Sequence, residues 1–119
     1  MSVLFTRRGA PPTYPAIVTI TGTGNATYCY ATINGTKHSA AASNLEVLPG
    51  DVITFGVYGY SSTYYGRVTI DGTQALDVTN KTTQTYEWTV PDGVVAISIA
   101  FTYTSSTYSR NGRIAVTTS

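Results

Sequence analysis

Hydrophobic and polar residues alternate with a period of two along almost the whole chain after Pro15. Successive side chains of a β-strand point to opposite faces, so this alternation predicts strands that each bury one face. No segment shows the 3.6-residue period of an amphipathic helix, and we therefore expect an all-β protein. The expected strands cover residues 17–21, 27–33, 36–41, 45–48, 51–58, 67–70, 73–79, 85–90, 94–103 and 113–117.

Turn-forming dipeptides separate these strands. The strongest is Asn34-Gly35, because a type I′ hairpin turn needs positive φ at both central residues. Three further turn signals are Pro49-Gly50, Asp71-Gly72 and Asp92-Gly93. Several short strands with closely spaced turns predict a β-sandwich or a β-barrel. We expect an immunoglobulin-like antiparallel β-sandwich, and a small closed barrel is the alternative.

Two of the expected strands have the most regular hydrophobic faces. In the strand at 94–103, the residues expected to form the core stripe are Val95, Ile97, Ile99 and Phe101. The strand at 85–90 places Trp88 on the same face as Tyr86 and Val90. Because only a short turn separates these two strands, we expect them to pair as the central hairpin, with Trp88 and Phe101 facing inward.

Length and charge exclude several classes of protein. The 119 residues suit a single domain, which we place at 16–119, and the one cysteine, Cys29, cannot form an internal disulfide. Seven basic and six acidic residues give a net charge of +1, and only Arg7 and Arg8 are adjacent basic residues. Nucleic-acid binding needs a clustered basic face, so we expect none. No apolar run approaches the ~20 residues of a membrane helix, so we expect no membrane insertion.

The first fifteen residues differ from the rest of the chain. They contain three prolines and no alternation, which predicts an extended N-terminal arm at 1–15, because proline lacks the N–H that a sheet needs. The arm is either a frayed terminus or an attachment segment. Leu4 and Phe5 favour attachment, since bulky apolar side chains are unfavourable in water. Arg7 and Arg8 follow these apolar residues, the reverse of a signal peptide, so we expect no secretion.

The sequence offers little for catalysis or metal binding. His38, the one histidine, lies just after a hairpin turn, where a strand residue usually faces solvent. The six acidic residues are scattered, whereas calcium sites and paired-carboxylate enzymes need them clustered. One histidine and one cysteine are too few for a four-ligand zinc site. We therefore predict a non-enzymatic protein with no catalytic residue, cofactor or metal.

Tyrosine is the unusual feature of the composition, with ten in the chain. The segment Ser-Ser-Thr-Tyr occurs twice, at 61–64 and 105–108, each time between two strong strands. Tyrosine, serine and glycine are typical of recognition loops, because tyrosine offers a broad amphipathic contact with few torsions to freeze. The other interpretation is that tyrosine and threonine simply favour strands. The candidate ligand-facing residues are Tyr58, Tyr60, Tyr64, Tyr65, Tyr103 and Tyr108.

Three segments carry a resemblance to a known group of proteins. The opening Leu4-Phe5-Thr6-Arg7-Arg8-Gly9-Ala10-Pro11-Pro12 precedes one expected sandwich, and the body contains LEVLPGDVITF at 45–55 and GRIAVT at 112–117. This arrangement resembles small virion proteins of tailed bacteriophages that carry an immunoglobulin-like domain. The resemblance implies a structural, capsid-decoration, tail or adhesion role, with the arm residues Leu4, Phe5, Arg7 and Arg8 as the attachment point.

Two functions remain as alternatives. The first is a virion structural or accessory protein, made in the host cytoplasm without a signal peptide and held by its arm to other capsid or tail proteins. The second is a carbohydrate-binding module whose tyrosine rings stack on the sugars of cell-surface glycans. The second accounts for the tyrosine-rich loops but leaves the arm without a role.

Overall fold

The structure is a computed structural model that describes residues 14–106 and 109–119. These residues form ten β-strands and no helix, which confirms the all-β prediction, and each expected strand is present with ends that differ by a few residues. The strands are β1 (Ala16–Thr23), β2 (Cys29–Ile33), β3 (Thr36–His38), β4 (Ala42–Val47), β5 (Val52–Gly59), β6 (Gly66–Ile70), β7 (Thr73–Val78), β8 (Thr82–Thr89), β9 (Ala96–Thr104) and β10 (Asn111–Thr118). Within this part of the chain, no helix is long and apolar enough to cross a membrane.

All odd-numbered strands run in one direction and all even-numbered strands run in the other. β1 is parallel to β9 and β6 is parallel to β10, while the other strand pairs are antiparallel. The expectation of a purely antiparallel sandwich is therefore corrected to a mixed sheet. Alternation along a strand determines which side chains face inward, but it does not determine which strand lies beside it.

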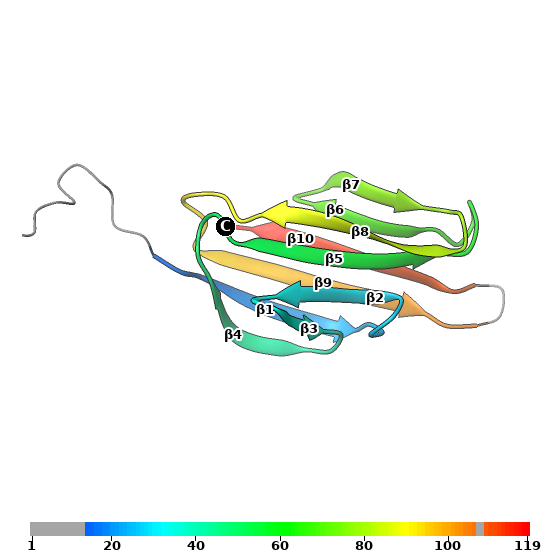
Figure 1. Ribbon diagram of the computed structural model, residues 1–119, viewed down its shortest axis with the longest axis horizontal. Coiled ribbons are helices and arrows are strands. Elements are labelled where there is room, and N and C mark those ends of the chain that lie inside the picture. The colour runs from blue at the N-terminus through cyan, green and yellow to red at the C-terminus, as the bar shows by residue number, and fades with distance from the viewer. Residues whose placement is uncertain (1–13, 107–108) are drawn as a thin grey trace, which may run out of the picture.

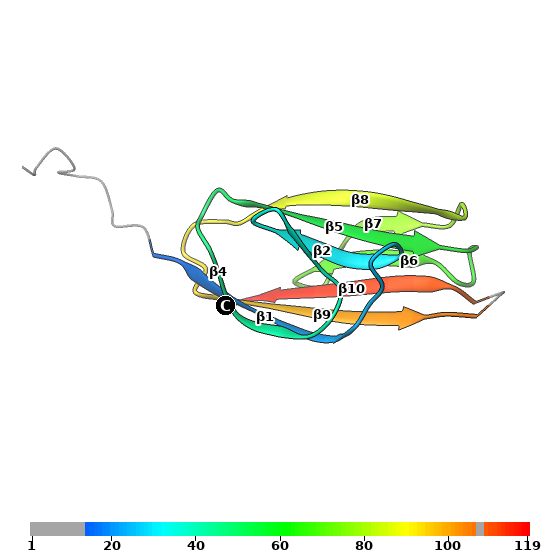
Figure 2. The same cartoon turned by 60° about the horizontal axis from the view of Figure 1, so that its bottom comes forward.

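The strands form two layers that face each other (Figures 1 and 2). One layer has the order β3-β2-β5-β8, and the other has the order β4-β1-β9-β10-β6-β7. A single residue pair, Gly59 with Asn111, links β5 to β10, so that the ten strands form one mixed sheet of nearly barrel-like shape.

The expected central hairpin of β8 and β9 does not form. β8 pairs with β5 in one layer, whereas β9 pairs with β1 and β10 in the other. Residues 90–95 therefore carry the chain from one layer to the other instead of reversing it within a sheet. The hairpin prediction was wrong because a short connection allows both arrangements, and only the packing of the layers decides between them.

One hydrophobic core fills the space between the layers. Its buried side chains are Ala16, Val18, Ile20, Cys29, Ala31, Ile33, Val47, Ile53, Phe55, Val57, Val68, Val78, Val90, Ile97, Ile99, Phe101, Ile114 and Val116. Trp88 packs against this core, with its ring centroid 6.4 Å from that of Phe55. The inward position of Ile97, Ile99 and Phe101 is thus confirmed. Val95 is 65% exposed, because it lies before the first residue of β9.

The first hairpin has the predicted turn. Asn34 and Gly35 have φ values of 50° and 79°, as a type I′ turn requires, and Ile33 pairs with Thr36 across them. The Asn34 amide also donates a hydrogen bond to the backbone carbonyl of Glu46 at 3.0 Å. This bond ties the β2–β3 turn to β4, which belongs to the other layer.

Candidate functional site

Five loops lie at one end of the molecule, because each of them follows an odd-numbered strand. The described residues of these loops are 24–28, 39–41, 60–65, 79–81, 105–106 and 109–110. We call this the tyrosine end, after the six side chains gathered there: Tyr28, Tyr58, Tyr60, Tyr64, Tyr65 and Tyr103. The opposite end holds the start of β1 and the end of β10, and we call it the terminal end (Figure 1).

The structure places most of the predicted tyrosines. Tyr60, Tyr64 and Tyr65 lie in the β5–β6 loop, where Tyr64 is 37% exposed and the other two are half-buried. Tyr58 and Tyr103 are half-buried within β5 and β9 rather than in loops. β5 and β9, the strands that precede the two Ser-Ser-Thr-Tyr segments, run in the same direction and therefore end at the same end of the molecule. The remaining candidates, Tyr108 and the arm residues Leu4, Phe5, Arg7 and Arg8, lie outside the described residues.

Three tyrosines and an arginine form a cluster at this end. The Tyr28 ring meets the Tyr58 ring edge-on at 5.0 Å and stacks with the Tyr103 ring at 6.1 Å between centroids. The Arg110 guanidinium lies 4.6 Å from the centroid of Tyr28, and its Nη1 donates a hydrogen bond to the Tyr28 hydroxyl at 3.4 Å. The Arg110 Nε is buried without a hydrogen-bond partner among the described residues. The cluster closes this end of the core with aromatic contacts and carries a positive charge.

Every lysine and arginine in the described part of the chain lies over a tyrosine ring. The distances to the ring centroids are 4.1 Å for Lys37 over Tyr30, 4.3 Å for Arg67 over Tyr65, 4.9 Å for Lys81 over Tyr60, 4.6 Å for Arg110 over Tyr28 and 4.2 Å for Arg113 over Tyr65. Such contacts occur roughly once per 70–80 residues in proteins, so this is a marked concentration. As a consequence, several tyrosine ring faces are covered by the protein's own cations.

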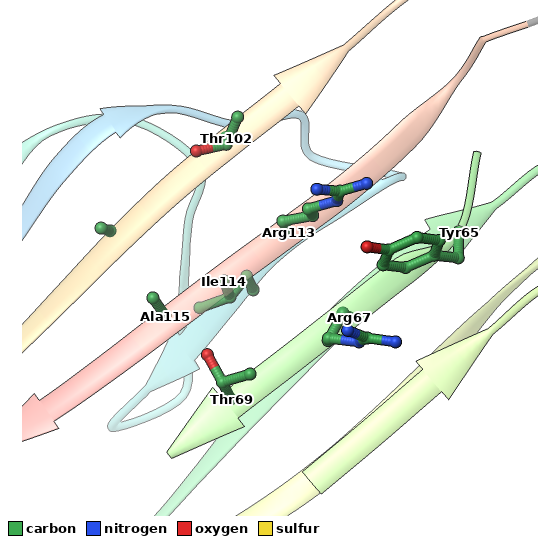
Figure 3. A pocket seen from close by; sticks show the side chains of 8 residues that line it. Tyr65, Arg67, Thr69, Thr102, Arg113, Ile114 and Ala115 are labelled. Atoms are coloured by element: carbon green, nitrogen blue, oxygen red, sulfur yellow. The ribbon is translucent and has the colours of Figure 1, made fainter. Parts of the chain in front are cut away.

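A shallow groove lies on the outer face of β6, β9 and β10, next to the β5–β6 loop. Its volume is about 270 Å³, and it is lined by Tyr65, Arg67, Thr69, Ala100, Thr102, Arg113, Ile114 and Ala115. Figure 3 shows the Tyr65 ring between the Arg67 and Arg113 side chains, with Thr69 and Thr102 further along the same surface. We call this site the arginine groove.

The charge in the arginine groove is only partly balanced. Arg67 Nε lies 3.1 Å from Asp77 Oδ1, and this is the one ion pair within residues 14–106 and 109–119. Arg113 contacts the Tyr65 ring but has no carboxylate partner in that part of the chain. Two guanidinium groups against one carboxylate leave a site that attracts anions.

The described residues contain no cluster of side chains that could bind a metal ion. No group of three or more histidine, cysteine, aspartate or glutamate side chains lies close enough together there to hold an ion. His38 lies on β3, opposite Ala31 of β2. The described surface offers hydroxyl groups, aromatic rings and guanidinium groups, which can bind a ligand.

The aromatic and charged side chains of the cluster and the groove that were not among the candidates from the sequence are Tyr28, Arg67, Arg110 and Arg113. The alternation in β6 and β10 does indicate that Arg67 and Arg113 point outward. It does not indicate that these two strands, far apart in the chain, are neighbours. The groove depends on that pairing, and no local signal in the sequence reports it.

The chain was also compared with known proteins. No protein-family model matches it, and neither the curated proteins nor the solved structures contain a match.

Proposed function

We propose that this chain is a non-enzymatic structural or accessory protein of a tailed-bacteriophage virion. Its immunoglobulin-like sandwich is displayed on the capsid or tail, and it is assembled in the host cytoplasm. The terminal end, together with the arm at 1–15, attaches the domain to other virion proteins. The tyrosine end then points away from the particle, where it can contact the host surface.

The observation that carries this proposal is the distribution of exposed apolar side chains. Among the described residues, the large hydrophobic side chains exposed at the terminal end are Tyr14, Ile17, Leu48, Val52 and Val95. The remaining one, Tyr64, is at the tyrosine end. Exposed apolar side chains concentrated in one region are typical of interaction surfaces. The terminal end is also where residues 1–15 join β1, so the arm and these side chains can engage one partner together.

The proposal is tested on particles of the phage that encodes the chain. Cryo-electron microscopy of purified particles should locate the domain with its terminal end against the particle. A chain starting at Thr13 should keep its β-rich circular dichroism spectrum but fail to bind particles that lack the protein. A Leu48→Ser, Val95→Ser variant should also bind less, whereas Tyr64→Ala should bind normally.

Three outcomes contradict the proposal. If the protein is absent from purified particles, the virion role is wrong. If the shortened chain and the double variant both bind normally, attachment does not use the terminal end. If the shortened chain unfolds, the first residues belong to the sandwich and do not form an attachment arm.

A carbohydrate-binding module is the second candidate. The observation that favours it is the exposed Tyr64 ring, 37% accessible, in the loop that borders the arginine groove. Since Lys81 lies over Tyr60 and two arginines lie over Tyr65, stacking on a sugar would fall mainly to Tyr64. A glycan array with the isolated protein tests this candidate, and Tyr64→Ala should weaken any signal, because it removes the exposed ring.

A further inference from the structure

Arg67 of β6 and Arg113 of β10 are direct partners in the parallel pair of these strands. Their side chains therefore leave the sheet on the same face, and like charges placed opposite each other on neighbouring strands destabilise a sheet. Tyr65 reduces this cost, because its ring lies 4.3 Å from one guanidinium carbon and 4.2 Å from the other. An anion bound to the guanidinium group of Arg113 would reduce it further.

The contact with Tyr65 also determines how the arginines can bind. A guanidinium that lies over an aromatic ring uses its face, and its in-plane N–H groups remain directed outward. Two such N–H groups match the two oxygens of a carboxylate. Arg113 is the exposed member of the pair and has no carboxylate partner within the described residues. Arg67 is already bound to Asp77 at 3.1 Å, so Arg113 is the main anion-binding group.

The rest of the groove is suited to a sugar ring. Ala100 and Ala115 pair across β9 and β10, so two small apolar side chains form its floor. A sugar presents C–H groups on its ring face and hydroxyl groups around its edge. The floor can contact the C–H groups, and the hydroxyls of Thr69 and Thr102 can bond the edge. The volume of about 270 Å³ lies just below the ~300–1,000 Å³ of typical small-molecule sites, which suits one sugar residue.

We propose that the arginine groove binds one carboxylate-bearing sugar residue, of the hexuronic acid type, with its carboxylate on Arg113 and its ring over Ala100 and Ala115. The inference rests on the carbohydrate-binding candidate and names its ligand class. It goes beyond the display role, which does not depend on it. The same chemistry is present in a free sugar acid and in an acidic polysaccharide, so both are included in the test.

The experiment is a titration of the isolated full-length protein, followed by NMR or calorimetry. Glucuronate supplies both the ring and the carboxylate, glucose supplies the ring alone, and acetate supplies the carboxylate alone. An oligomeric uronide tests the polysaccharide source. Arg113→Gln removes the anion-binding group, and Ala100→Leu fills the floor without changing the charge. Lys37→Gln is the matched control, because it removes one cation over a tyrosine ring elsewhere.

Glucuronate should bind at least about tenfold more tightly than glucose or acetate, since tenfold corresponds to roughly 1.4 kcal/mol, the scale of one charge-assisted hydrogen bond. Arg113→Gln should weaken glucuronate binding by a similar factor, and Lys37→Gln should change it by less than about twofold, because Lys37 lies outside the groove. Ala100→Leu should weaken glucuronate but not acetate. An oligomer that binds more tightly than the monomer identifies a polysaccharide as the source, whereas equal binding identifies the single sugar residue.

Four results overturn the inference. Equal binding of glucuronate and glucose means that the arginines do not recognise the carboxylate. Equal binding of acetate and glucuronate means a simple anion site. Equal losses in Arg113→Gln and Lys37→Gln mean non-specific charge attraction, and no binding of any uronate means that the groove is not a sugar site. The display role is tested separately on particles, so a failure here leaves that test unaffected.

Discussion

Gly59 of β5 and Asn111 of β10 form the one residue pair that joins these two strands, and it lies at the tyrosine end. Asn111 is only 7% exposed, and its amide donates a hydrogen bond to the Ser109 carbonyl at 3.4 Å. The Gly59 carbonyl accepts a hydrogen bond from the backbone N–H of Lys81 at 2.8 Å. The same junction therefore supports the loops that follow β5, β7 and β9.

Gly59→Ala should destabilise the protein. A Cβ atom on Gly59 would lie 1.7 Å from the Val78 carbonyl oxygen and 2.4 Å from the Gly66 nitrogen, so the backbone would have to move. Overpacking of this kind costs at least about 1–3 kcal/mol of unfolding free energy, which chemical denaturation measures.

Gly93→Ala provides the control for this substitution. Gly93 has a φ of 82° and nothing within 4 Å of its added Cβ, so only backbone strain is expected, about 1–2 kcal/mol. If Gly59→Ala costs less than Gly93→Ala, the close approach of the strands at Gly59 is not a constraint on the fold.

The tyrosines at the tyrosine end should divide into supporting and exposed residues. Tyr58→Ala removes an aromatic contact with Tyr28 and part of the core boundary, so we expect a loss of about 2–4 kcal/mol, towards the scale of core aromatic deletions. Tyr64→Ala changes an exposed loop residue and should stay within about 0.5 kcal/mol. Thermal and chemical denaturation measure both. A loss of several kcal/mol in Tyr64→Ala would mean that Tyr64 supports the fold and is not a recognition residue.

The sequence predicts the strands well because the determinants of a strand are local. Alternation places Ile97 and Ile99 on an inward face, and the two positive φ values at Asn34-Gly35 follow from residue type alone. Which strands become neighbours is determined by the packing of the two layers, over long distances in the chain. For this reason the pairing of β8 with β5, and of Arg67 with Arg113, could not be predicted. The sequence therefore predicted tyrosines as candidate site residues, but it did not predict Arg67 and Arg113 as part of the site.

The thiol of Cys29 should be unreactive in the folded protein. Cys29 is fully buried, and burial raises the pKa of its thiol from 9.0 to about 12. Three pKa units correspond to about a thousandfold less thiolate at pH 8, and the thiolate is the reactive form. Labelling with a disulfide reagent at pH 8 should be very slow in the native state and fast in guanidinium chloride. Fast labelling of the native protein would show that this part of the core opens readily.

The pKa of Cys29 also predicts a loss of stability at alkaline pH. Because burial raises the folded-state pKa, the contribution of the Cys29 thiol to the free energy of unfolding is fully present below pH 9.0, where the thiol is protonated in both states. It is lost as the pH rises from 9.0 towards 12, because the unfolded state ionises first. Denaturation of the native chain and of Cys29→Ala across this range isolates the effect, since the tyrosines are common to both proteins.

Asp71 should contribute stability that is lost in acid. Its carboxylate accepts hydrogen bonds from the Thr118 backbone N–H at 2.8 Å and from the Thr118 hydroxyl at 2.7 Å, which tie the β6–β7 turn to the end of β10. These bonds, the hydroxyl first, lower the pKa of Asp71 below its ordinary value of 3.8. A lowered folded-state pKa means that the contribution is present above pH 3.8 and disappears as the pH falls through the folded-state pKa.

Asp71→Asn tests this prediction without changing the turn, because asparagine tolerates the φ of 49° at this position. The melting temperature of the native chain should exceed that of Asp71→Asn by a constant amount from pH 7 down to about pH 5, and the difference should shrink below about pH 4, where the unfolded carboxyl becomes protonated. Asp92→Asn is the control, because Asp92 also precedes a turn glycine but accepts no such pair of bonds in the described part of the chain. If the difference in melting temperature between the native chain and Asp71→Asn does not change between pH 7 and pH 3, the charge of Asp71 does not stabilise the turn.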